Sequence, residues 1–167
     1  MTNIKISTTK VTRGNCISVT TDGGCRSNPG PGAWAFVVKK SYGKPQVVEN
    51  SGFLPYCTNN QAEYRALEAA CLTLARWDHD EILGGVLISS DSKLVVEQVN
   101  KRWKVKDEVL RPYFDTAYQA YQSLCIRTKV VLQWIPREQN LDADRLCNEE
   151  MDRRGIVSNK TKVGLPS

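Results

Sequence analysis

The chain has 167 residues with 41% hydrophobic and 25% charged residues, which is the composition of one globular domain. It contains neither an apolar run of about 18 residues nor an apolar signal core at its start, so we expect a cytoplasmic protein and no membrane span. The net charge of +5 mildly favours a polyanionic partner, although an ordinary basic enzyme has the same charge. The six cysteines form no Cys-x-x-Cys pair, so we expect free thiols in a reducing compartment.

The predicted elements begin with a short β-branched strand at 16–22, which ends on Asp22 and is followed by Gly23 and Gly24. The further strands are predicted at 33–39, 46–54, 85–90 and 129–135. The helices are predicted at 59–77, 92–99, 107–124 and 140–154. This order predicts an α/β domain with a five-stranded mixed sheet flanked by helices. The domain is expected over 16–155, between a polar N-terminal tail at 1–15 and a C-terminal tail at 156–167.

The predicted helix at 59–77 carries an acid in line with its apolar stripe. Thr58 and Gln61 have the spacing of a capping box at the start of this helix. The apolar stripe recurs every three or four positions, at Leu67, Ala70, Leu74 and Trp77. Extended backward, the stripe reaches Glu63. Glu63 is therefore either a buried functional acid or a charge that merely favours the helix N-terminus.

Further acids stand where helices begin. Asp91 follows the apolar strand at 85–90, and Asp142 and Asp144 open the last helix. Each has an ordinary explanation, as a helix N-cap supplied by Asp91 or Ser92 and as a favourable interaction with the helix dipole at the other two.

Considered together, four of these acids favour one shared site. Asp22 and Asp91 follow predicted strands, where ligands bind in α/β sheets, and Glu63 and Asp144 lie near helix N-termini. Clustered carboxylates repel by ~4 kcal/mol per pair near a protein surface, so the cluster requires positive charge. An all-oxygen site suits Mg²⁺ or Mn²⁺. Two such ions about 4 Å apart can activate a water and stabilise the leaving oxygen of a phosphodiester.

Four segments resemble, in order, the signature segments of type 1 ribonuclease H: DGGCRSNPGPGAWAF, TNNQAEYRAL, SSDSKLVVEQVNKRWK and PREQNLDADRLCNE. The resemblance covers about 16–154 and implies a ribonuclease H-like fold. It implies an endoribonuclease that hydrolyses the RNA strand of RNA–DNA hybrids with two Mg²⁺ or Mn²⁺ ions, leaving 3′-hydroxyl and 5′-phosphate ends. The implied catalytic residues and metal ligands are Asp22, Glu63, Asp91 and Asp144. Asp144 is chosen over Asp142 because it is the acid of the AD-x-L pattern.

The resemblance also implies contacts with the substrate. Gly23 and Gly24 would let the backbone lie against the RNA strand, where a Cβ would clash, and their N–H groups could reach the 2′-hydroxyl. The positions that match contacts with the RNA strand are Asn28, Asn59, Asn60 and Gln61. Thr58 matches a position that holds a DNA phosphate.

One departure from the family pattern concerns proton transfer. Many members place a mobile histidine before the last acid, but the one histidine here, His79, lies in the acidic turn WDHDE. Arg137 or Glu138 occupies the matching region, which leaves the proton-transfer role unassigned.

A second departure concerns the long basic protrusion that many relatives carry after the third acid. Here a short basic segment stands in its place, made of Lys101, Arg102, Lys104 and Lys106 around Trp103. A basic run with an embedded aromatic suits a nucleic-acid backbone, so Trp103 and Lys104 are candidate substrate contacts. Packing of Trp103 on the core explains that residue equally well.

Three other interpretations remain open. A proofreading-type exonuclease shares the fold, but its first acid is followed one residue later by a second acid, unlike Asp22-Gly23-Gly24. A non-catalytic hybrid-binding module would lack one of the four acids. A ribonuclease H domain of a reverse transcriptase is the third, although a start at Met1 and a short tail favour a free-standing enzyme. We expect an RNA–DNA hybrid as the partner and a monomer that requires no protein partner.

Overall fold

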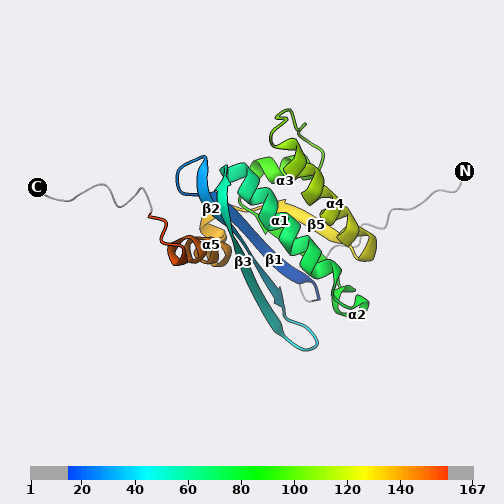
Figure 1. Ribbon diagram of the computed structural model, residues 1–167. Coiled ribbons are helices and arrows are strands. Elements are labelled where there is room, and N and C mark those ends of the chain that lie inside the picture. Colours follow the sequence, from blue (N-terminus) through cyan, green and yellow to red (C-terminus); the bar gives the residue numbers. More distant parts are fainter. Residues whose placement is uncertain (1–14, 158–167) are drawn as a thin grey trace, which may run out of the picture.

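One mixed sheet organises the computed structural model, which describes residues 15–157 (Figure 1). Its strands are β1 (Ile17–Cys25), β2 (Gly30–Lys40), β3 (Gln46–Cys57), β4 (Val86–Ser90) and β5 (Val130–Trp134). They lie in the order β3-β2-β1-β4-β5, with antiparallel pairing among β1, β2 and β3 and parallel pairing from β1 through β4 to β5. The predicted α/β fold with a five-stranded mixed sheet is confirmed.

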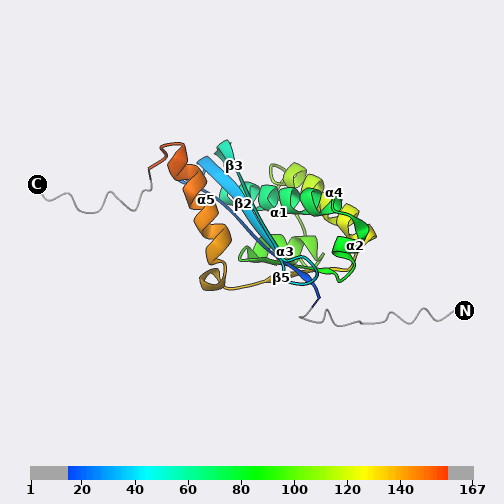
Figure 2. The same ribbon diagram turned by 90° about the horizontal axis from the view of Figure 1, so that it is seen from below.

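The helices cover both faces of this sheet. They are α1 (Asn59–Ala75), α2 (His79–Ile82), α3 (Lys93–Val99), α4 (Arg111–Arg127) and α5 (Leu141–Arg153), with a 3₁₀ turn η1 (Arg137–Gln139) before α5. Figure 2 shows α1, α3 and α4 on one face and α5 on the other. No helix among residues 15–157 combines the length and the apolar composition that a membrane crossing requires.

Each face of the sheet has its own apolar core, as the sequence of β2 illustrates. Phe36 and Val38 belong to the larger core under α1, α3 and α4. Alternate residues of the same strand, Ala33, Ala35 and Val37, pack with the buried side of α5. A strand covered on both faces is apolar at successive positions, and β2 has this pattern.

The predicted end of the first strand at Asp22 is wrong. β1 continues to Cys25, because β2 pairs with it up to that residue, Gly23 opposite Trp34 and Cys25 opposite Gly32. The parallel partner β4 ends earlier, since its last pair joins Ser90 to Thr21. Asp22 is therefore paired with β2 inside the sheet, but it lies one residue beyond the last pair that β1 makes with β4.

Other boundaries also differ from prediction. The helix predicted from residue 107 begins at Arg111, because the Asp107 side chain accepts hydrogen bonds from the amides of Val109 and Leu110 in a preceding turn. The short helix α2 was not predicted; its first residue, His79, is exposed.

Two further predictions concern the tails and the cysteines. Residues 1–14 and 158–167, which make up most of the two predicted tails, lie outside the described residues. All six cysteines are described, and all are free thiols in the structure.

Gly23 fixes how closely α1 approaches the sheet. A Cβ built on Gly23 would overlap the backbone carbonyl of Ala62 and the backbone amide of Glu63. The start of α1 therefore rests directly on β1, which is a close approach that only glycine permits. Gly24 is different, because a Cβ there would meet only Asn59 Oδ1, at 3.6 Å.

We expect Gly23→Ala to lower the free energy of unfolding by at least about 2 kcal/mol, because α1 must move away from β1. In a domain of this size that lowers Tm by roughly 4–8 °C. Gly24→Ala is the matched control and should melt near the parent. Equal melting of the two variants would show that α1 adjusts without strain.

Candidate active site

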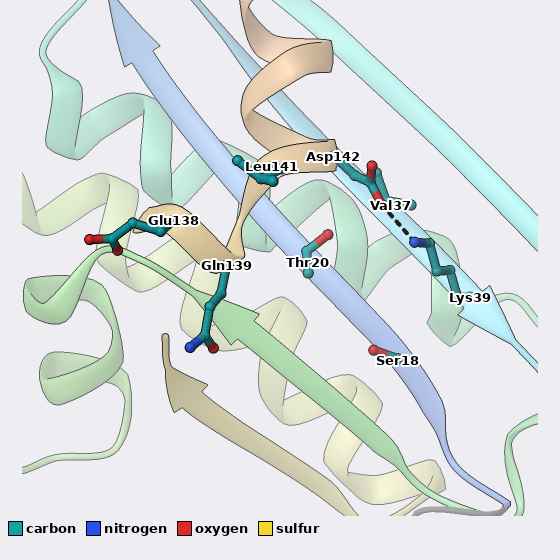
Figure 3. Close-up of a pocket in the computed structure, with 8 residues that line it drawn as sticks. All are labelled: Ser18, Thr20, Val37, Lys39, Glu138, Gln139, Leu141 and Asp142. Atoms are coloured by element: carbon teal, nitrogen blue, oxygen red, sulfur yellow. Dashed lines mark hydrogen bonds and ion pairs between the residues drawn. The ribbon is translucent and has the colours of Figure 1, made fainter. Parts of the chain in front are cut away.

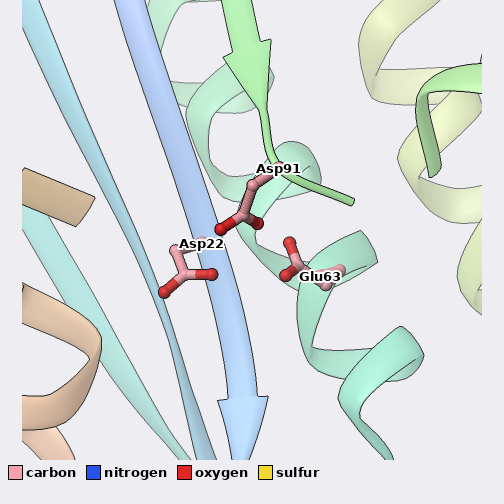
Figure 4. A group of neighbouring side chains, drawn as sticks. All are labelled: Asp22, Glu63 and Asp91. Carbon is pink, nitrogen blue, oxygen red and sulfur yellow. The ribbon is translucent and has the colours of Figure 1, made fainter. Parts of the chain in front are cut away.

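Three carboxylates converge at one end of the sheet. Asp22 comes from β1, Glu63 from the first turns of α1, and Asp91 from the residue directly after β4, and Figure 4 shows their side chains pointing toward one another. One carboxylate oxygen from each of the three residues lies within 4.8 Å of those of the other two. Asp22 and Glu63 are buried, with 8% and 9% of their surface exposed, and Asp91 is half-buried.

The register of two parallel strands explains why Asp22 and Asp91 meet. Thr21 pairs with Ser90, so the next residue of each strand carries one of the two acids at the same level of the sheet. Ligands bind at this carboxyl edge in α/β sheets. Glu63 joins them because α1 begins with the predicted capping box, in which the Thr58 hydroxyl accepts from the Gln61 amide and the Gln61 side chain accepts from the Thr58 amide. The buried stripe of α1 includes Glu63, as its spacing indicates.

The three acids disturb one another's ionisation. Burial, and then the charges of Asp91 and Asp144, raises the pKa of Asp22 to about 7. Burial and the neighbouring charges of Asp22 and Asp91 raise the pKa of Glu63 well above its usual range. Burial also raises the pKa of Asp91, although a hydrogen bond from the Asn140 side chain and the charge of Arg137 act in the opposite direction. Without a cation, these acids therefore retain protons to a higher pH than ordinary carboxyl groups do.

Asp144 lies beside this group rather than within its tightest part. It contributes to the same hollow of about 570 Å³, and its carboxylate is 3.7 Å from the guanidinium of Arg137. Asp142 faces elsewhere, where its carboxylate is 2.6 Å from Lys39 Nζ in a separate hollow on the α5 face of the sheet (Figure 3). The two acids of α5 are therefore separated by structure, and Asp144 is the one at the site.

The site residues fit a divalent cation. All of the candidate ligands are carboxylate oxygens, which Mg²⁺ and Mn²⁺ prefer. Glu63 Oε2 is buried without a hydrogen-bond partner, which is a costly arrangement for a polar atom unless a bound group completes it.

Asn59, which lines the hollow, and Asn28, which hydrogen-bonds the Asn59 amide, are both oriented by backbone groups. Asn59 Oδ1 accepts a hydrogen bond from the Cys25 amide at 2.9 Å, and Asn28 Oδ1 accepts from the Asn59 amide at 3.2 Å. The Cys25 thiol adds a contact of 3.2 Å to Asn59 Oδ1. With both carbonyl oxygens engaged, the side-chain NH₂ groups of Asn28 and Asn59 are left as the groups that can donate to a ligand.

The remaining residues predicted to contact the substrate divide into two sets. Gly23, Gly24 and Asn59 contribute to the hollow that contains the acids. Thr58 and Gln61 use their side chains in the capping box, and Asn60 is exposed on the first turn of α1.

The basic segment lies in a different place and is partly engaged with the protein itself. Lys101 Nζ lies 3.9 Å from the centre of the Tyr118 ring, and Arg102 forms two hydrogen bonds with Glu97, of 2.7 and 2.8 Å. Trp103 is 47% exposed and contributes, with Lys104, to a separate hollow of about 290 Å³. Packing of Trp103 in the core is thus not observed.

Sequence reasoning missed three polar residues at the site. Arg26 and Asn148 contribute to the acid-containing hollow, and Arg26 joins β1 to α5 through a 2.6 Å ion pair with Asp152 and hydrogen bonds to Asn148. Asn140 is wholly buried between Thr21 and the start of α5. One signal was available in the sequence, since Asn140 precedes the acidic start of the last helix, where an N-cap is expected.

Comparison with known proteins gives a consistent result. The family described as RNase H matches residues 15–153. Ribonuclease HI of Halobacterium salinarum is 34% identical over 140 residues, which are 84% of this chain and 66% of that protein. The bifunctional protein Rv2228c of Mycobacterium tuberculosis is 37% identical over 139 residues, or 81% of this chain. The chain spans only 35% of the length of that mycobacterial protein.

Solved structures show the same similarity. LC11-RNase H1 in complex with an RNA/DNA hybrid superposes with a TM-score of 0.73 at 33% identity, covering 83% of this chain and 98% of that one. The N-terminal RNase H domain of the mycobacterial protein has a TM-score of 0.70 at 34% identity, covering 84% of this chain and 96% of that one.

The raised pKa values predict an unusual pH dependence for the metal-free protein. Between its ordinary value near 3.8 and its folded value of about 7, Asp22 binds more protons in the folded than in the unfolded state, so stability falls as pH rises through this range. Glu63 acts in the same direction. We expect Tm in a chelator to fall between about pH 5 and about pH 8, and Asp22→Asn to flatten that fall.

Asp142→Asn is the control for this experiment. The ion pair with Lys39 lowers the pKa of Asp142, so its contribution is constant over this range and the variant should keep the parental slope. A parental slope in Asp22→Asn as well would contradict the assignment of the strain to Asp22.

Proposed function

The chain belongs to the ribonuclease H family, and we propose that it hydrolyses the RNA strand of RNA–DNA hybrids, leaving 3′-hydroxyl and 5′-phosphate ends. The observation that carries this proposal is the convergence of Asp22, Glu63 and Asp91 within 4.8 Å at the carboxyl edge of the sheet. The family depends on divalent metal, and this group of acids requires positive charge. We also propose that the protein is a cytoplasmic monomer that needs no protein partner.

The residues that would hold the metal are Asp22, Glu63 and Asp91, with Asp144 at their side. We propose Mg²⁺, in two ions, as the natural cofactor, with Mn²⁺ as a substitute. A divalent metal in such a site supplies a nucleophilic water at neutral pH and neutralises the charge of the reacting phosphate. Glu63, whose Oε2 has no partner in the protein, is the acid most in need of a bound cation.

Other residues of the site would orient the RNA strand. Asn28 and Asn59 offer side-chain NH₂ groups beside Gly24, where the backbone is open, because only Asn59 Oδ1 lies within 4 Å of a Cβ built there. Donors at such a place can bond the 2′-hydroxyl, the group that distinguishes RNA from DNA. We therefore assign discrimination between RNA and DNA to the side-chain NH₂ groups of Asn28 and Asn59, which backbone amides hold in place.

Arg137 occupies the place next to Asp144 where the family often has a histidine. Its side chain is 79% exposed and only 3.7 Å from the Asp144 carboxylate, so it can turn between that acid and a phosphate. A guanidinium remains protonated at neutral pH, so Arg137 can hold a phosphate but is unsuited to proton transfer.

The central prediction concerns catalysis. Asp22→Asn should reduce cleavage of a labelled RNA–DNA hybrid to background while the variant stays folded and binds the hybrid, because it removes a ligand from the metal site. Asp142→Asn should cleave at the parental rate, since Asp142 pairs with Lys39 outside the site. The assay compares hybrid, RNA duplex and DNA duplex, each with Mg²⁺ and with chelator. Cleavage of the DNA duplex at a rate comparable to that of the hybrid, or full turnover in chelator, would contradict the proposal.

A second prediction concerns the basic segment. Lys104 and Lys106 are exposed, whereas Lys101 and Arg102 are engaged by Tyr118 and Glu97. If the two exposed lysines contact phosphates, Lys104→Ala/Lys106→Ala should flatten the salt dependence of hybrid binding by roughly one to two units of log–log slope, with a smaller change in kcat.

The charge-matched control for the basic segment is Lys39→Ala/Lys40→Ala. Lys39 and Lys40 are the last two residues of β2, and they lie beside Asp142 and Tyr42, respectively. The control should keep the parental salt slope. A parental salt slope in Lys104→Ala/Lys106→Ala would mean that these two lysines are solvated and do not contact the substrate.

A further inference from the structure

Asn140 is buried at the junction of three elements that carry candidate metal ligands. It has no exposed surface and stands between η1 and α5, as the residue before the first turn of α5. Its side-chain Nδ2 donates a 2.8 Å hydrogen bond to the carbonyl of Thr21, which is the residue before Asp22. Its backbone carbonyl accepts the amide of Asp144 at 3.2 Å.

The Asn140 side chain also reaches the third element. It lies close enough to the carboxylate of Asp91, directly after β4, to act against the rise of the pKa of that acid. One residue therefore hydrogen-bonds the backbone beside Asp22 and the backbone of Asp144, and it lies beside the side chain of Asp91. These three acids come from β1, from the end of β4 and from α5, which are far apart in the chain.

Helix capping does not explain the orientation of the Asn140 side chain. Asparagine is among the best N-cap residues, yet the Asn140 side chain makes no capping hydrogen bond to α5. The N-cap residues of two other helices do, since Thr58 accepts from the Gln61 amide and Ser92 from the Val95 amide. At α5 the capping oxygen, Asn140 Oδ1, is buried without a partner.

Glu63 Oε2 is the other buried side-chain oxygen or nitrogen without a hydrogen-bond partner in the described part of the chain. The structure thus leaves the start of α5 without a side-chain cap and directs the amide donor of Asn140 toward β1.

We propose that Asn140 is a positioning residue that sets the spacing of Asp22, Asp91 and Asp144 for metal binding. The inference rests on the proposed function, since it concerns the ligands of that same site. Residues that orient ligands from behind typically change metal affinity or activity by 10–100-fold when they are replaced, so the expected effect is at least about 10-fold.

The experiment measures Mg²⁺ binding directly, by calorimetric titration and by melting with chelator and with Mg²⁺. Asn140→Ala should bind Mg²⁺ about 10-fold more weakly or worse, and Mg²⁺ should raise its Tm by less than half of the parental increase. With hybrid substrate, kcat should fall while KM stays at the parental value, because the contacts to the nucleic acid are unchanged.

The matched control is Asn100→Ala. The Asn100 side chain likewise donates through Nδ2 to a strand carbonyl, that of Leu132 at 3.0 Å, but it joins the end of α3 to β5. This variant should melt lower than the parent in chelator and in Mg²⁺ alike, with unchanged Mg²⁺ affinity.

Asn140→Ser separates positioning from helix stability. Serine is an equally good N-cap, but its shorter side chain cannot bridge Thr21 and Asp91. We expect this variant to fold and to show the same loss of Mg²⁺ affinity as Asn140→Ala, which also keeps the test decisive if the alanine variant does not fold.

Parental Mg²⁺ affinity in Asn140→Ser, or an equal loss in Asn100→Ala, would overturn the positioning role and leave the proposed function standing. Absence of Mg²⁺ binding in the parent would overturn both.

Discussion

Mutual repulsion of carboxylates is the constraint on which the rest of this structure depends. Asp22 and Glu63 are almost fully buried and Asp91 is half-buried, with one carboxylate oxygen of each within 4.8 Å of those of the other two. Burial, and then the charges of the neighbouring acids, raise the pKa values of Asp22 and Glu63 and destabilise the metal-free fold. The surrounding structure must therefore hold the acids together against their own charge. Strain of this kind at a functional site is part of the trade between stability and activity.

Rigid packing supplies that hold from both faces of the sheet. On one face, the direct contact of Gly23 with the backbone of Ala62 and Glu63 fixes α1 against β1, and with it the side chain of Glu63. On the other face, Asn140 and Arg26 tie α5 to β1, through the Thr21 carbonyl and through Asp152. The parallel register of β1 and β4 places the two remaining acids side by side. Each acid is thus carried by an element whose position is fixed independently of the acids.

Electrostatic and polar roles are divided between separate parts of the surface. The acids and Asn59 share one hollow, and Asn28 holds the backbone amide of Asn59 beside it. Trp103 and Lys104 belong to another hollow, on the segment between α3 and α4. Under the proposed function, binding strength and chemistry can change independently, because exposed lysines act through long-range charge while the acids act only at contact distance.

The sequence by itself determined the order of the elements, the capping box at Thr58 and Gln61, the placement of Glu63 on the buried stripe of α1, and the family. These features depend on local periodicity or on short segments, which a chain carries without reference to its fold. It did not determine that β1 continues past Asp22, because that length is set by pairing with β2 and not by the local residues. Nor did it show that Gly23 lets α1 pack directly on β1, that Asp142 pairs with Lys39, or that the Asn140 side chain makes no capping hydrogen bond. Each of these depends on residues that are brought together from distant parts of the chain, and only strand register and helix orientation decide such contacts.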